Sequence, residues 1–200
     1  RQMCIRDRLP LRLLPMPGEI VGLHIFEQRY QVLFNDLEAM HVDEFGIPFF
    51  HDSKIWRVGA KMRLVTVQKR HSGGKRDVAV TATGLFRLKN MDEAPGVVPY
   101  PLGEVEDIQE WSDWPLGKAC ADARDALIQD MKAHEMYVAN LENQGLVRLI
   151  QHLGIDARQR ADILSKASIQ EMQQSLLERI EVTRRLIQQS PQDGSSFFVN

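Results

Sequence analysis

Hydrophobic and polar positions change their period within one stretch near the N-terminus. Aliphatic residues alternate with glycine and histidine over residues 21–25, which predicts a short, half-buried β-strand. From Phe26 onward, apolar residues recur every three or four positions, which predicts a helix over residues 27–40 with one broad apolar face. Phe26 and Tyr30 lie one helical turn apart on that stripe. We therefore expect both rings to point into the core.

Short alternating runs after this helix predict further strands. Residues 45–50 form one that Pro48 interrupts, which is typical of a sheet edge. Residues 62–67 and 78–83 alternate on either side of a turn that contains Gly-Gly, which predicts a β-hairpin. Gly84 follows directly and indicates a bulge or a sharp bend. The other predicted strands cover residues 9–14 and 97–108.

Composition changes abruptly at Trp114-Pro115. All three tryptophans, six of the eight phenylalanines and seven of the nine prolines precede Pro115. Residues 116–190 contain one aromatic residue, Tyr137, and no proline, so we predict a β-rich part followed by an all-helical part. The predicted divisions are a non-native or disordered leader at residues 1–8, a β-rich domain at 9–114, a helical bundle at 115–190 and a disordered tail at 191–200.

The helical part shows regular apolar steps and clear start signals. Apolar residues step by three or four over residues 116–141, which predicts one long helix that begins after Pro115. Asp156 with Gln159 predicts the cap of a later helix, and Ser168 is followed three residues later by a glutamate, as in a capping box. The predicted helices cover residues 116–141, 143–153, a segment after Asp156, and a segment from Ser168 to about residue 190.

Charge and cysteine content narrow the class of protein. The formal net charge is −2, which argues against broad electrostatic attraction to nucleic acid or anionic membrane. Cys4 and Cys120 are the only cysteines, too few for a disulfide framework or a four-cysteine zinc site, and we expect no metal. No apolar run approaches the roughly 18 residues that a membrane span needs. These features favour a cytoplasmic protein without membrane contact.

Residues 17–30, with the sequence PGEIVGLHIFEQRY, are the most informative stretch. They resemble the opening signature of the Lon N-terminal domain, the substrate-recognition module of ATP-dependent Lon proteases, which also occurs as a stand-alone protein. Weaker likenesses follow in the same order at residues 58–60, 84–88 and 100–105. The resemblance implies an α+β fold, namely a PUA-like β pseudobarrel with one crossing helix, followed by a helical bundle.

The resemblance also implies a function, which is to bind unfolded polypeptide or a protein partner without catalysis. Two alternatives stay open: an adaptor or regulator of a separate ATP-dependent protease, and a PUA-like module that binds a small molecule or RNA. The signature positions are expected to be mainly structural: Pro17, Gly18, Leu23, Ile25, Phe26, Glu27, Arg29, Tyr30, Gly84 and Arg87.

Large aromatic residues are the candidates for a partner-binding surface. Phe49, Phe50 and Trp56 flank the predicted edge strand, and Trp111 and Trp114 lie at the junction of the two parts. Such residues are more often buried than exposed, so core packing is the alternative for most of them. We expect a binding groove where the β-rich part meets the helices, because ligand sites favour such interfaces.

A basic cluster surrounds the predicted hairpin turn, in Lys69, Arg70, His71, Lys75 and Arg76. It could contact phosphates, as in RNA-binding proteins of the PUA-like kind. No aromatic residue interleaves these charges, although stacking on single strands would require one. A solvated loop is favoured, and nucleic acid is not an expected partner.

Catalytic motifs are incomplete. No phosphate-cradling loop of an ATPase is present. His134-Glu135 begins like the helical zinc-protease motif but lacks the second histidine, so packing at a helix seam is favoured for His134. Ser195 follows Asp193-Gly194 and superficially resembles the Lon protease nucleophile, yet no rigid domain surrounds it to supply a base and oxyanion donors. We expect no enzymatic activity and no cofactor.

Overall fold

The computed structural model describes residues 2–5, 13–92, 96, 98–108, 116–136, 141 and 145–189. Contacts divide the chain into two compact units, Arg1–Gln109 and Glu110–Asn200, and each is described by itself below. The predicted boundary at Trp114-Pro115 and the predicted tail at 191–200 lie outside the described residues. No described helix combines the length and the hydropathy that a bilayer crossing requires.

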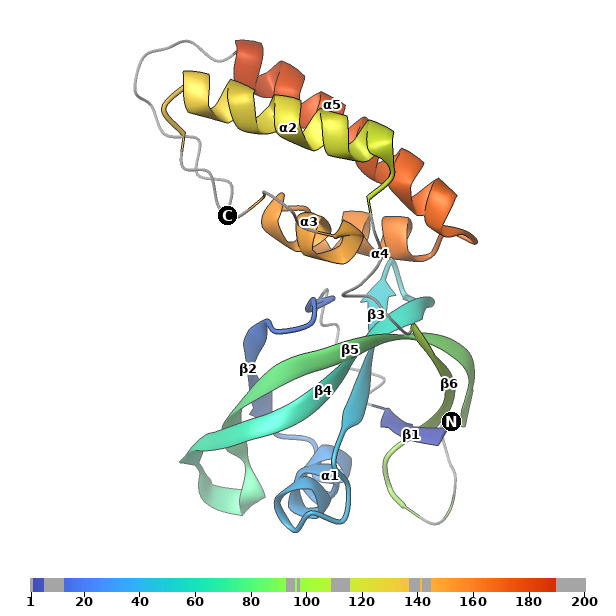
Figure 1. Ribbon diagram of the computed structural model, residues 1–200. Helices are drawn as coiled ribbons and strands as arrows, with labels where there is room; N and C mark the ends of the chain where they lie inside the picture. Colours follow the sequence, from blue (N-terminus) through green and yellow to red (C-terminus); the bar gives the residue numbers. More distant parts are fainter. Residues whose placement is uncertain are drawn as a thin grey trace. The chain divides into compact units, whose positions relative to one another are not determined.

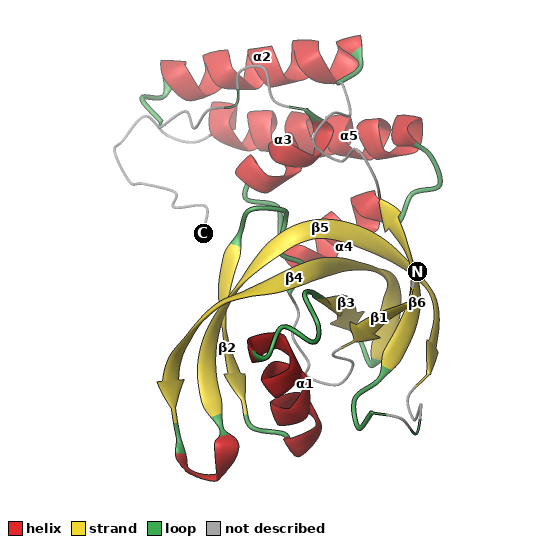
Figure 2. Ribbon diagram, turned by 60° about the horizontal axis from the view of Figure 1, so that its bottom comes forward, coloured by secondary structure: helices red, strands yellow, loops and turns green. Residues whose placement is uncertain are grey.

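The first unit is an α+β structure built on one sheet, which is antiparallel except for one strand pair (Figures 1 and 2). One helix, α1, lies against this sheet (Figure 2). The elements are β1 (Gln2–Ile5), β2 (Ile20–Ile25), α1 (Gln28–Glu38), β3 (Phe45–His51), β4 (Lys54–Arg70), a 3-10 turn η1 (Ser72–Gly74), β5 (Arg76–Asp92) and β6 (Leu102–Ile108).

Strand pairing in this unit closes on itself. The strand order is β2-β5-β4-β3-β1-β6, and β5 also pairs with β6. Strands β5, β4, β3, β1 and β6 therefore form a circuit, and β2 adds to the far half of β5. The β1–β3 pair is parallel and the other pairs are antiparallel. Most of the buried residues of the unit come from these strands, from β2 and from α1.

Strand β1 corrects the prediction of a leader outside the fold for residues 2–5, whereas residue 1 and residues 6–8 lie outside the described residues. Cys4 pairs with Phe45 on one side and with Leu102 on the other, so β1 links β3 to β6. Met3 is buried and packs in a cluster with Phe86, Leu88 and Val105. Four residues among arginines are too short for a periodicity signal, and only their partners define them as a strand. Of the predicted strand at 9–14, Leu13 and Leu14 are irregular, and the rest lies outside the described residues.

Helix α1 follows the predicted apolar stripe with one exception. Tyr30, Leu33, Phe34 and Leu37 are buried, and Phe34 meets Phe45 edge to face with ring centroids 5.3 Å apart. The expectation that Phe26 is buried is wrong, because 45% of this residue is exposed. The helix begins at Gln28 after the N-cap Glu27, so Phe26 still belongs to extended chain. Leu23 and Ile25 point inward, and strand alternation turns the next side chain outward.

The β4–β5 hairpin is confirmed and supplies the two longest strands. Each has 17 residues, joined by the turn around η1. The bulge predicted at Gly84 is also present: Lys61 pairs with Gly84 and Met62 with Ala82, which leaves Thr83 as the extra residue. The edge prediction for β3 is wrong at its start, because Phe45 and Gly46 pair with β1 as well as with β4.

The second unit is helical in its described residues, with α2 (Lys118–Ala133), α3 (Leu146–His152), α4 (Ala157–Leu164) and α5 (Ile169–Gln189). The two predicted caps are confirmed: Gln159 N donates to Asp156 Oδ1 at 2.8 Å, and Glu171 N donates to Ser168 Oγ at 3.2 Å. The prediction of one helix over residues 116–141 is wrong, since α2 ends at Ala133. Glu135 has a φ of 55°, which a right-handed helix cannot continue through.

Candidate functional site

The outer half of β4 has a free edge. β3 pairs with β4 only as far as Met62, whereas β5 pairs with it out to Arg70. Within the described part of the chain, residues 63–70 therefore have a strand partner on one side alone. In such a strand, alternate backbone N–H and C=O groups point away from the partner, and here bulges at Val65 and Gln68 interrupt this alternation. This edge can accept hydrogen bonds from, and donate them to, another extended chain.

A groove of about 640 Å³ runs beside this edge, and we call it the edge groove. One wall is the end of α1 and the following loop, residues 37–44, and the other is residues 63–67 of β4. The exposed apolar side chains in the lining are Met40, 83% exposed, and Val65, 52% exposed. The charged lining residues are Glu38, Asp43, Glu44 and Arg63, an excess of acid.

Met40 takes its exposed position because of how α1 ends. Ala39 is the C-cap, and Met40 follows with a φ of 57°, in the left-handed region that residues other than glycine seldom adopt. His41 N then donates to Asp36 O at 2.9 Å, which satisfies a terminal carbonyl of the helix. A large thioether side chain held outward by unfavourable backbone geometry marks a functional candidate.

An ionic network holds the two walls of the edge groove together. Glu38 at the end of α1 accepts hydrogen bonds from Arg70 of β4 and Arg76 of β5. Arg76 is buried and also donates to Asn35 Oδ1 at 2.7 Å. Partial burial by itself raises the pKa of Glu38, but the hydrogen bonds and charges of Arg70 and Arg76 outweigh it, so this pKa lies below its ordinary value. The carboxylate therefore stays ionised and fixes α1 to the hairpin.

The same network changes the interpretation of the basic hairpin turn. Two of its five basic residues, Arg70 and Arg76, are paired with Glu38; Arg76 is buried, whereas the Arg70 side chain stays exposed. His71 donates to Asp77 instead, with 2.7 Å between Nε2 and Oδ2. This pairing weakens the positive field that phosphate contacts would need.

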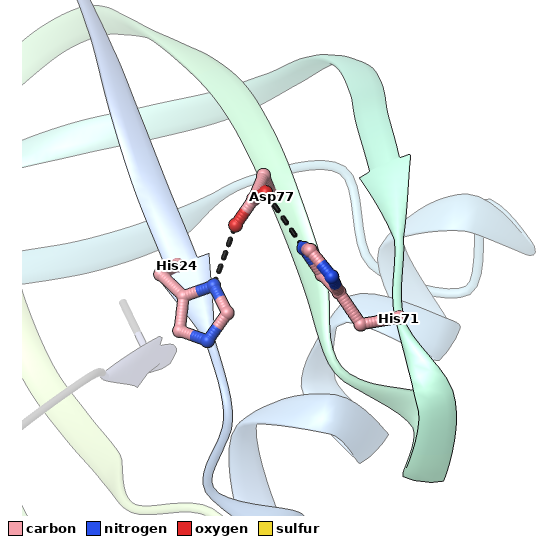
Figure 3. Close-up of side chains that lie close together, drawn as sticks. All are labelled: His24, His71 and Asp77. Carbon is pink, nitrogen blue, oxygen red and sulfur yellow. Dashed lines mark hydrogen bonds and ion pairs between the residues drawn. The ribbon is translucent and has the colours of Figure 1, made fainter.

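A second polar cluster lies on the outer face of the sheet, at the end of β2 (Figure 3). Asp77 of β5 stands between two imidazoles: His24 of β2 contacts one carboxylate oxygen and His71 the other. The donor atoms of the three side chains all lie within 4.8 Å of one another. Among the described residues this is the group whose donors fit a metal ion. From the sequence alone we expected no metal site.

The aromatic residues predicted to bind a partner do not come together as one exposed surface. Phe49 is fully buried and packs edge to face against Trp56 with centroids 5.5 Å apart, so its assignment to a contact surface is wrong. Phe50 and Trp56 are partly buried in neighbouring strands, and their contact role stays a prediction. Trp111 and Trp114 lie outside the described residues.

The signature residues shape the turn into β2 and the start of α1. Gly18 has a φ of 92°, and its N–H donates to Ala82 O at 2.8 Å, so the chain reverses against β5. Arg29 donates to Glu27 at 3.0 Å and stacks over the Tyr30 ring at 4.6 Å. The remaining signature positions lie in or beside strands: Pro17 and Phe26 flank β2, Leu23 and Ile25 are its buried residues, and Gly84 and Arg87 belong to β5.

Cys120 is not an activated nucleophile. Burial raises the pKa of the Cys120 thiol, which is the opposite of what a reactive cysteine needs. His134 Nδ1 donates to the carbonyl of Asp130 at 2.9 Å, so it caps the end of α2; its packing at a helix seam stays a prediction. Ser195 lies outside the described residues.

Comparison with known proteins places this fold. No family model and no curated protein sequence matches the chain. The crystal structure of a Lon N-terminal domain protein from Xanthomonas campestris matches with a TM-score of 0.64 at 20% identity, over 90% of this chain and 98% of that one. The N-terminal domain of the Lon protease of the Mycobacterium avium complex matches with a TM-score of 0.65 at 12% identity, over the same shares. The chain thus has the fold of the Lon N-terminal domain.

Proposed function

We propose that the chain is a non-catalytic module that binds unfolded polypeptide, and that an extended segment docks along the edge groove. The observation that carries this proposal is the free edge of residues 63–70, which lies directly beside exposed Met40 and Val65. A polypeptide in extended conformation would add as a further strand, with its backbone bonded to β4. Recognition through the backbone tolerates many sequences, which suits a substrate-recognition module.

The side chains of the edge groove would then select among segments. Met40 is flexible and polarisable, so it adapts to apolar side chains of different shapes. Glu44 is held by Arg63 with 3.2 Å between Oε1 and Nη2, whereas Asp43 is exposed. The excess of acid in the lining favours segments with apolar and basic side chains over acidic ones.

The fold supports the general class of function, though not the position of the binding site. Two of the matching structures are Lon N-terminal domains, and the closed strand circuit fits the PUA-like pseudobarrel that the sequence signature implies. We propose that residues 9–114 and 115–190 correspond to the β domain and the helical bundle of that architecture, with β1 added to the former.

The edge groove can be tested with charge substitutions. Met40→Asp and Val65→Asp should each weaken binding of a fluorescein-labelled, permanently unfolded polypeptide by about tenfold or more, measured by fluorescence anisotropy. Leu186→Asp is the matched control, because Leu186 is an equally accessible apolar residue on α5, 62% exposed. Thermal melts of all three variants should stay close to the parent, since the side chains are exposed.

Backbone pairing can be tested on the unaltered chain. On addition of the same polypeptide, amide resonances of residues 63–70 should shift and their hydrogen exchange should slow. If Met40→Asp and Val65→Asp bind as tightly as Leu186→Asp and the β4 amides do not respond, the edge groove is not the binding site.

A further inference from the structure

We propose that His24, His71 and Asp77 form a binding site for Zn²⁺ or a chemically similar first-row divalent ion, a role separate from polypeptide binding in the edge groove. Two imidazole nitrogens and one carboxylate oxygen are donors that zinc accepts in proteins. The three donor atoms lie within 4.8 Å of one another, although the residues are far apart in sequence.

The backbone places these side chains on one face. His24 and Asp77 are direct partners in the β2–β5 register, so their side chains emerge side by side from the sheet. His71 comes from the hairpin turn, where its N–H donates to Lys75 O at 2.8 Å and fixes the loop. Figure 3 shows the two imidazoles converging on the carboxylate from these separate segments. A bound ion would therefore tie β2 to the β4–β5 hairpin.

The distances suit replacement of protons by a metal ion. His24 Nδ1 lies 2.5 Å from Asp77 Oδ1, and His71 Nε2 lies 2.7 Å from Asp77 Oδ2. Donors bound tetrahedrally to zinc at about 2.0–2.2 Å stand roughly 3.3–3.5 Å apart. Each imidazole must therefore move away from the carboxylate by about 1 Å or less, and the ligand atoms that lie furthest apart, within 4.8 Å, must approach each other by up to about 1.5 Å, which exposed side chains can do by rotation.

The protons on the two imidazoles can be displaced by a metal ion at a low free-energy cost. A carboxylate only accepts hydrogen bonds, so the ring nitrogen that faces Asp77 carries the proton in both histidines. When an ion binds, a neutral imidazole moves that proton to its other nitrogen, and an imidazolium releases one to solvent. An aspartate is ionised at neutral pH, so the carboxylate ligand needs no deprotonation.

Access and charge decide the class of ion. The exposed fractions of the His24, His71 and Asp77 side chains are 50%, 31% and 36%, so the ion can enter directly and water can complete its coordination. Ca²⁺ and Mg²⁺ prefer oxygen donors alone, whereas imidazole favours zinc, cobalt and nickel. Lys69 is the cation opposite Asp77 in the β4–β5 register, and its flexible side chain can turn away into solvent.

The test titrates Zn²⁺ alone into the full chain near neutral pH by isothermal calorimetry. We expect one ion per chain, and a weakening of at least about tenfold in each of His24→Ala, His71→Ala and Asp77→Asn, because even indirect supports of a metal ligand affect affinity by that much. His41→Ala is the matched control: His41 is exposed and lies 3.8 Å from Asp36, but belongs to no described group of three donors. This variant should bind as the parent does.

Nitrogen-detected NMR of the unaltered chain gives a second measurement that does not depend on variants. Zn²⁺ should shift His24 Nδ1 and His71 Nε2 and move their protons to the opposite ring nitrogens. Co²⁺ should develop the intense visible absorption of a tetrahedral site. The proposal is overturned if no stoichiometric binding occurs, if these two nitrogens do not respond, or if His41→Ala weakens binding as much as His24→Ala.

Discussion

Replacing Gly59 by alanine would force a new atom into the tightest contact between β3, β4 and β5. A Cβ there would lie 2.4 Å from Cζ of Phe86, 2.6 Å from the carbonyl oxygen of Ile47 and 2.8 Å from Cα of Pro48. Two of these atoms are backbone of the paired strand, since Pro48 is the register partner of Gly59. Phe86 is fully buried, so its ring has no free space into which to rotate.

The expected cost follows from this geometry. Overpacking a core usually costs about 1–3 kcal/mol, and we expect the upper end because backbone must move. Alanine regains about 0.5–1 kcal/mol through its lower chain entropy when unfolded. The net loss for Gly59→Ala should therefore be about 2 kcal/mol. Urea unfolding followed by tryptophan fluorescence measures it, because Trp56 lies in the same strand.

Gly22→Ala supplies the control for this reasoning. Gly22 also lies in a strand, but a Cβ there would meet no atom within 4 Å. Its substitution should leave stability unchanged or raise it by up to about 1 kcal/mol. Equal stability of the two variants would refute the claim that close approach requires glycine at position 59.

Three further predictions concern single side chains. Phe34→Ala should destabilise by about 3–5 kcal/mol, and Phe26→Ala by about 1 kcal/mol or less, in urea unfolding, because only the first ring is buried. Glu38→Gln should destabilise at neutral pH but not in acid. The pKa of Glu38 is lower in the folded than in the unfolded protein, so its carboxylate stabilises the fold fully above the unfolded-state pKa, and this stabilisation is lost as pH falls through the folded-state pKa. Urea unfolding of the parent and the variant across this pH range tests the prediction, and a difference in stability that persisted in acid would contradict it. Asp130→Asn should lower helical stability by about 1 kcal/mol or less, seen by circular dichroism, because Arg184 Nε lies 2.8 Å from that partly exposed carboxylate; an unchanged melt would show that the pair contributes nothing.

The sequence predicted correctly those elements that are defined by interactions between residues close together in the chain. The stripe of α1, the Gly-Gly hairpin turn and the caps at Asp156 and Ser168 each depend on residues a few positions apart. Phe26 shows where this fails: helical spacing continued through it, but strand alternation from β2 controls its direction. Hydrophobic periodicity cannot show whether a residue between a strand and a helix follows the strand or the helix, and so cannot show which way its side chain points.

The candidate sites depend on contacts that no spacing rule contains. His24 and Asp77 come together only because they are partners in the β2–β5 register, and no known sequence motif has this spacing between the two residues. The edge groove arises because β3 stops pairing at Met62 while β4 continues. The sequence contains one signal for this groove. In an alternating strand, Val65 lies on the same face as Arg63, so an apolar residue falls on a face where a polar one is expected. An apolar residue on a polar face is grounds to look for a partner.

The way the strand circuit closes has a consequence for folding speed. The first strand, β1, leaves the ribosome before any of its partners, and Cys4 pairs with Leu102, about a hundred residues later. Contacts of such long sequence separation slow folding, because loop entropy is lost before the contact forms. The β4–β5 hairpin can form early, whereas β3 and β6 keep exposed edges until β1 docks between them. Aggregation during synthesis should therefore compete with this last pairing step.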